Sequence, residues 1–189
     1  VRAAPSNDLC AGAALIASTP YTAPASALGG PGATNDLDVT CNGTTVTTSG
    51  VWFTFTPALT GTAILSETSA NDTVQAIFTG SCGTLTQVAC SDPESFSFVM
   101  TGGTQYWILI GMFSTTAPTV NYGLTVTYAL PPANDTCGAA VALSLDTPVT
   151  GTTVGAMNDY QLAGAGAFTG VGQTVSTAPG GDAVYTFTA

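Results

Sequence analysis

The sequence contains no histidine and no lysine, and Arg2 is the only basic residue among its 189 amino acids. Without imidazole or amine groups, the chain lacks the commonest general bases, the usual activators of a serine nucleophile and the amine of a Schiff base. Eleven acidic residues give a net charge of -10, and no basic patch is left to bind a phosphate backbone. We therefore expect a non-enzyme that does not bind nucleic acid, and we assign no catalytic residue.

Long hydrophobic runs are also missing. The longest strongly apolar run, Tyr106 to Phe113, is far shorter than the roughly 20 residues of a membrane-spanning helix. The sequence does not begin with methionine or a basic segment, so we expect any signal peptide to have been removed or left out. Low charge with abundant serine and threonine suits an extracellular or cell-surface protein without a membrane span.

The five cysteines indicate an oxidising compartment. They are Cys10, Cys41, Cys82, Cys90 and Cys137. None forms a CxxC pair, and without histidine a zinc site would need four thiolates, so disulfides are expected. Cys82 and Cys90 flank a segment short enough to bridge neighbouring strands or close a hairpin, and Cys10 with Cys41 would tie the N-terminal segment to the first strong strand. Cys137 is left unpaired or intermolecular.

An internal repeat dominates the organisation of the chain. Three landmarks recur in the same order about 125 to 130 positions later: Pro5–Cys10 and Pro132–Cys137 (P-x-N-D-x-C), Gly32–Asp36 and Gly155–Asp159, and Phe53–Thr56 and Tyr185–Thr188. We predict one complete module over residues 1–130 and the N-terminal part of a second over 131–189, joined at a double proline. The second copy lacks a counterpart of Cys41, and we expect either that the chain has been cut within this module or that another chain completes it.

Period-two alternation predicts six short strands. They span residues 51–56, 62–68, 74–79, 95–100, 105–113 and 122–128. The nearly continuous apolar run over 105–113 is typical of a central strand buried on both faces. We predict that Asn35–Asp38, the densest acidic cluster, forms a solvated loop. The predicted fold is all-β: an antiparallel β-sandwich, jelly-roll-like, with an incomplete second module.

The order of the motifs resembles the bacterial pre-peptidase C-terminal domain family, whose members are β-sandwich modules of secreted peptidases and surface proteins. The motifs are the N-D-x-C sequence, the aromatic strand at 51–56, and the segments Asp72–Leu85, Val88–Asp92 and Gly103–Ile110. The resemblance covers residues 5–128 and, in part, 132–189. It implies a non-catalytic module that binds substrate or matrix or acts as a spacer, and in some members binds calcium. Pro93-Glu94 departs from the family pattern.

Calcium is the metal that the composition favours, because hard oxygen ligands are the only plentiful donors. Five residues in or next to loops are candidate ligands: Asn7, Asp8, Asp72, Asp92 and Glu94. The alternative is that Asn and Asp stabilise turns through bonds between side chain and backbone.

Three asparagines fit the N-glycosylation acceptor pattern, which arises often by chance in a threonine-rich chain. They are Asn42, Asn71 and Asn134.

Two non-enzymatic functions follow. In the first, the protein is an extracellular structural subunit that assembles with copies of itself by strand addition into a filament, through the open second module and Cys137. In the second, it is an ancillary module that binds a matrix protein or polysaccharide and targets a larger secreted peptidase or adhesin.

Overall fold

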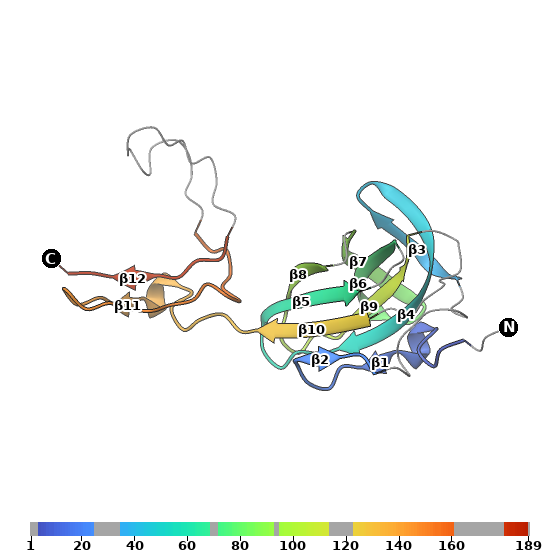
Figure 1. Cartoon of the computed structure of the whole chain (residues 1–189), viewed down its shortest axis with the longest axis horizontal. Coiled ribbons are helices and arrows are strands. Elements are labelled where there is room, and N and C mark those ends of the chain that lie inside the picture. Colours follow the sequence, from blue (N-terminus) through green and yellow to red (C-terminus); the bar gives the residue numbers. More distant parts are fainter. Residues whose placement is uncertain are drawn as a thin grey trace. The chain divides into compact units, whose positions relative to one another are not determined.

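The computed structural model describes residues 4–24, 35–68, 72–92, 95–113, 123–160 and 180–188 (Figure 1). The chain divides into two compact units, Val1–Tyr128 and Ala129–Ala189. Helical structure in the described ranges is limited to the 3₁₀ turns η1 (Cys10–Gly12) and η3 (Cys137–Ala139). No helix in these ranges is long and apolar enough to cross a membrane.

The first unit is a sandwich of two sheets, as the alternation predicts. The larger sheet has the order β1 (Ala14–Leu15), β4 (Thr44–Phe55), β9 (Tyr106–Met112), β6 (Thr73–Ser81) and β7 (Thr84–Ser91), and β3 (Asn35–Cys41) also pairs with β4. The smaller sheet has the order β2 (Tyr21–Thr22), β10 (Gly123–Ala129), β5 (Gly61–Thr68) and β8 (Ser95–Met100). The registers given for these strands are antiparallel except for β1 with β4.

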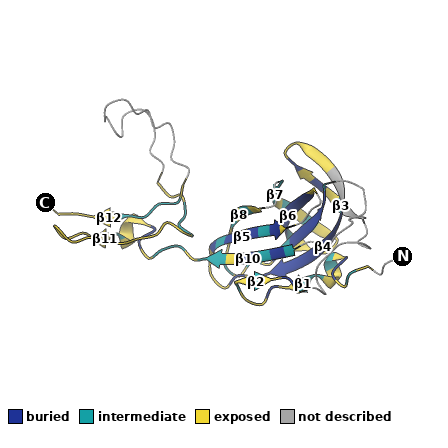
Figure 2. Cartoon of the chain, viewed as in Figure 1, coloured by how far each residue is buried: buried dark blue, intermediate teal, exposed yellow. Residues whose placement is uncertain are grey.

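The main core lies between the two sheets, where alternate residues of each strand point inward. Val51, Phe53 and Phe55 of β4 face the smaller sheet, which contributes Leu65 of β5 and Val126 of β10. Figure 2 shows the buried residues concentrated on the strands of this unit. The aromatic strand at 51–56 is thus a core strand.

A second hydrophobic cluster lies on the opposite face of the larger sheet. Its buried members are Val39, Cys41, Trp52, Val74, Ala76, Phe78 and Leu109. Because β9 contributes Ile108 and Ile110 to the main core and Leu109 to this cluster, both of its faces are buried. The doubly covered central strand predicted from the apolar run is confirmed.

The segment Asn35–Asp38, predicted as a solvated loop, lies in β3 instead. The inward positions of this strand carry Val39 and Cys41, both buried, whereas Asp38 and Thr40 are exposed. Asp38 thus occupies an outward position of an amphipathic strand, and the acidic segment forms a strand despite its charge.

A tight turn joins β3 to β4 at Asn42 and Gly43. Their φ angles are +50° and +80°, the left-handed pair of a type I′ hairpin turn, for which Asn-Gly is the favoured sequence. Beyond the turn, β4 pairs first with β3 and then, from Gly50 onward, with β9. A side chain at Gly50 would collide with the carbonyl oxygen of Ile110, so the change of partner requires glycine there.

The second unit has few regular elements in its described residues. The strand β11 (Val141–Ala142) runs parallel to β12 (Tyr185–Thr186), and η3 precedes β11. Several large apolar side chains of this unit are exposed, among them Phe187 at 53% and Leu145 at 73%.

Candidate functional site

Asn7 of the first N-D-x-C motif is a structural clamp on the edge of β4. Its carbonyl oxygen accepts a hydrogen bond from the Trp52 amide at 2.8 Å, and its Nδ2 donates to the Trp52 carbonyl oxygen at 3.0 Å. The residue is only 1% exposed. One asparagine therefore satisfies both backbone groups of Trp52, as a neighbouring strand would. Because Trp52 lies 45 positions away, this bond is a long-range contact and differs from the local turn stabilisation given as the alternative.

The cysteines pair across the fold and not with their sequence neighbours. Cys10 is bonded to Cys82 and Cys41 to Cys90, with Cα–Cα distances of 5.7 and 5.8 Å. The pairing of Cys82 with Cys90, and of Cys10 with Cys41, was wrong. Cys82 lies in the turn between β6 and β7, while Cys90 lies near the far end of β7. Eight residues of extended strand span roughly 26 Å, beyond the reach of a disulfide.

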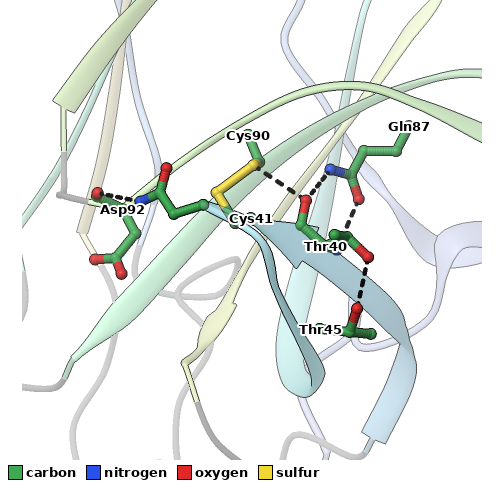
Figure 3. Close-up of a disulfide and its surroundings, with 7 residues drawn as sticks. Thr40, Cys41, Thr45, Gln87, Cys90 and Asp92 are labelled. Carbon is green, nitrogen blue, oxygen red and sulfur yellow. Dashed lines mark hydrogen bonds between the residues drawn. A yellow bond between two sulfur atoms is a disulfide. The ribbon is translucent and has the colours of Figure 1, made fainter.

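Side chains join β3 to β7 along a line that we call the seam, defined by Thr40, Cys41 and Asn42 on one side and Gln87, Cys90 and Asp92 on the other. Figure 3 shows the amide of Gln87 facing the backbone of Thr40: Nε2 donates to the Thr40 carbonyl oxygen at 2.6 Å, and Oε1 accepts from the Thr40 amide at 3.2 Å. The Cys41–Cys90 disulfide lies in the same row. The Asn42 Nδ2 donates to the Asp92 carbonyl oxygen at 3.2 Å. The seam thus closes β3, β4, β9, β6 and β7 around the second hydrophobic cluster.

The candidate calcium ligands are only partly placed by the structure. Asn7 and Asp8 are buried beside β4, whereas the exposed Asp72 precedes β6, on the other side of β9. Glu94 lies outside the described residues. Across the ranges that the structure describes, no three His, Cys, Asp or Glu side chains gather as a metal site. Calcium binding by this set stays an untested prediction.

The candidate glycosylation acceptors differ in how far their side chains are exposed to solvent. Asn42 is exposed at the hairpin turn, although its amide nitrogen is engaged with Asp92. Asn134 is 9% exposed and donates its Nδ2 to the Val184 carbonyl oxygen at 3.1 Å, so that nitrogen is not accessible to a transferase in this fold. Asn71 falls outside the described residues.

A buried polar group at one end of the main core escaped the sequence analysis. Thr73 Oγ1 donates to Glu67 Oε2 at 3.0 Å, and these side chains are 0% and 4% exposed. Gln75, on the same face of β6 as Thr73, is completely buried, and neither its Oε1 nor its Nε2 has a hydrogen-bond partner in the structure. The only sequence signal is a glutamine at an inward position of an otherwise apolar strand.

We expect the substitution Gln75→Leu to stabilise the protein by about 1 to 2 kcal/mol, because it removes two buried polar atoms that lack partners and keeps a similar volume. Denaturant unfolding followed by tryptophan fluorescence measures this, since Trp52 and Trp107 both belong to the first unit. As a matched control, Gln87→Leu on the neighbouring strand β7 breaks both bonds to Thr40 and is expected to destabilise. A loss of stability in Gln75→Leu would show that its amide is satisfied in solution.

Tyrosine ionisation is shifted at two structural positions. Burial raises the pKa of Tyr21 above its ordinary value, and burial together with the charge of nearby Tyr106 raises the pKa of Tyr128. The Tyr128 hydroxyl lies 2.7 Å from the Leu59 carbonyl oxygen and 3.1 Å from that of Met100. These contacts connect β10 to the end of β8 and to the loop before β5. The role of Tyr128 is therefore structural.

The outer face of the smaller sheet carries hydroxyl groups and no charged side chain in its described strands. We call it the hydroxyl face. Its members are Thr22, Thr62, Ile64, Ser66, Thr68, Ser95, Ser97, Val99, Thr125 and Thr127. Cross-strand pairs place Ile64 beside Ser97 and Thr62 beside Val99. The second cluster covers the central strands of the larger sheet on its outer side, whereas the hydroxyl face is open to solvent in its described residues.

The first unit matches a known protein family. A family model described as "Galactose binding domain-like", associated with the type IX secretion system (T9SS), matches residues 6–124. No curated protein and no solved structure matches significantly. The matched region coincides with the sandwich of the first unit. A secreted β-sandwich module is thus supported, whereas the pre-peptidase C-terminal family is not confirmed.

Proposed function

Because the chain belongs to the T9SS-associated galactose-binding-domain-like family, we propose that it is a secreted, non-catalytic module that binds neutral carbohydrate. The observation that carries this proposal is the family match over the whole sandwich. The T9SS association and the two disulfides point to a secreted or cell-surface protein. A binding and targeting role for a larger secreted protein agrees with this family.

The hydroxyl face is the surface that we assign to the sugar. Threonine and serine hydroxyls both donate and accept hydrogen bonds, as sugar hydroxyls do. Ile64 and Val99, at 37% and 47% exposure, offer apolar area to the C–H face of a sugar ring. The net charge of -10 disfavours anionic polysaccharides, which leaves neutral glycans as the favoured class.

Titration calorimetry of the full chain with galactose and with a neutral galactose-containing polysaccharide tests the proposal. The double variant Thr62→Val/Thr125→Val removes hydroxyls from the neighbouring strands β5 and β10 while it keeps the side-chain shape, and binding is expected to weaken at least about tenfold. Thr86→Val, an exposed threonine of β7 in the other sheet, is the matched control and leaves binding unchanged. No binding of either ligand, or equal binding by the double variant, contradicts the proposal.

Self-assembly into a filament by strand addition is a second candidate, and the exposed apolar residues of the second unit are what favour it. The described strands of the first unit are all engaged in the two sheets, so another copy offers no spare strand from its sandwich. Copies would have to meet through the β11–β12 pair and Cys137. The comparisons give this candidate no support, and we rank it second.

A further inference from the structure

The second unit reproduces the hydrogen bonds that begin the first. Val184 donates its amide to the Asn134 carbonyl oxygen at 2.7 Å, and Asn134 Nδ2 donates to the Val184 carbonyl oxygen at 3.1 Å. This is the clamp that Asn7 forms on Trp52. A 3₁₀ turn follows in both units, η1 at Cys10 and η3 at Cys137.

The strand pairs also correspond. Ala14 pairs with Phe53 in the parallel pair β1–β4, and Val141 pairs with Tyr185 in the parallel pair β11–β12. The next backbone hydrogen bonds match as well. The Ile16 amide donates to the Thr54 carbonyl oxygen at 2.9 Å, and the Leu143 amide donates to the Thr186 carbonyl oxygen at 2.8 Å. Cys137, Tyr185 and Phe187 therefore occupy the places of Cys10, Phe53 and Phe55.

Burial distinguishes the two copies. Ile16, Phe53 and Phe55 are 2%, 1% and 7% exposed, because the smaller sheet covers them. Their counterparts Leu143, Tyr185 and Phe187 are 37%, 37% and 53% exposed. The second unit thus presents, open to solvent, the apolar face that is the centre of the main core in the first.

Two further features of the first unit have no match in the described residues of the second. The edge of β4 that β9 occupies corresponds to an edge of β12 without a described partner strand. Cys10 is bonded to Cys82, whereas Cys137 is an exposed free thiol. A hollow beside this thiol is lined by Cys137, Tyr160, Asp182, Ala183, Val184 and Tyr185.

We propose that the second unit is an acceptor site for a polypeptide segment that repeats residues 57–128. Such a segment supplies a β9-like strand to the edge of β12, an apolar sheet over Leu143, Tyr185 and Phe187, and a cysteine in a tight turn that bonds to Cys137. Bond formation removes two protons and two electrons from the two thiols, and a small-molecule disulfide accepts them as it becomes two thiols. The proposal is independent of carbohydrate binding by the first unit.

A second copy of the 189-residue chain does not meet these requirements. Its sandwich strands are engaged in their own sheets, and its turn cysteine Cys82 is already bonded to Cys10. The free thiol that it offers, Cys137, lies at a 3₁₀ turn and not in a hairpin. The complementary segment must therefore be a repeat with a free turn cysteine.

The test is an extended chain in which residues 1–188 are followed by a second copy of residues 57–128, since Thr188 corresponds to Thr56. In the appended copy, the equivalent of Cys90 is changed to serine, because no cysteine after Cys137 in the sequence corresponds to Cys41. After refolding with oxidised and reduced glutathione, we expect Cys137 to be bonded to the appended equivalent of Cys82. Thiol titration and mass mapping of chymotryptic peptides measure this.

Two controls keep the length of the extended chain. Serine at the appended equivalent of Cys82 leaves Cys137 titratable, and an appended segment of scrambled order leaves it unbridged. Phe187→Ala adds a readout without cysteine: it lowers the unfolding midpoint of the extended chain and leaves that of the 189-residue chain unchanged. The proposal is overturned if Cys137 in the extended chain reacts as fast as in the original, or if the original chain itself forms dimers linked through Cys137.

Discussion

Removal of the Cys41–Cys90 bridge by Cys41→Ala/Cys90→Ala is expected to lower the free energy of unfolding of the first unit by about 4 kcal/mol. The bridge closes a loop with a sequence separation of 49 residues, and the loss of chain entropy in the unfolded state for such a loop has about this size. The Cys10–Cys82 bridge, with a separation of 72, has a similar expected effect. A domain stability of about 5 to 15 kcal/mol makes either loss a large fraction of the total.

Denaturant unfolding followed by tryptophan fluorescence measures both double variants. Cys137→Ala serves as the control, since that thiol is free and exposed and its loss leaves the first unit unchanged. Peptide mapping of the single variant Cys10→Ala adds a check on the connectivity, because it should liberate the thiol of Cys82 and leave Cys41 bonded. Liberation of the Cys41 thiol instead would refute the pairing.

Truncation of Trp52 is expected to have the second large effect, a loss of about 3 to 5 kcal/mol in Trp52→Ala. The side chain is 1% exposed and lies in the second hydrophobic cluster, with its ring centroid 5.4 Å from that of Phe78. Alanine would leave a cavity that the disulfide-linked β3 and η1 cannot fill by collapse. Because the same variant loses one of the two tryptophans, circular dichroism is the better signal for its unfolding.

The variant Trp52→Phe distinguishes the energetic effect of lost packing from that of a buried polar group. It keeps most of the ring volume and removes the buried Nε1, which has no hydrogen-bond partner in the structure, so its cost is expected to be well below that of alanine. Leu15→Ala, at a side chain that is 66% exposed on β1, is the control with little expected effect. Equal losses in Trp52→Ala and Leu15→Ala would argue against a packed second cluster.

The strands of the main core could be predicted because their alternation is strict. Val51, Phe53 and Phe55 share one face in sequence and in structure, and the run over 105–113 is buried on both faces. Such patterns depend on local burial alone, because alternate burial along a strand produces an alternation of apolar and polar residues in the sequence. The all-β sandwich follows from these strands and their turn residues.

Features that depend on distant residues could not be predicted in this way. The strand β7 was missed because Gln87 interrupts its alternation, and the reason for that glutamine is its pair of bonds to Thr40, 47 positions away. The cysteine pairing failed for the same reason, since the bridges join residues 72 and 49 positions apart. For the candidate site, the sequence marked Asn7 as a candidate calcium ligand, which stays untested, and did not predict its two bonds to Trp52.

The disulfides also restrict the order in which the first unit can be assembled. Each bridge joins a cysteine within the first 41 residues to Cys82 or Cys90, so the chain must be synthesised at least as far as residue 82 before either can close. In a reducing cytosol, the N-terminal segment and the β3–β4 hairpin would stay covalently unattached to β6 and β7. Both bridges therefore close only where the polypeptide meets an oxidising medium.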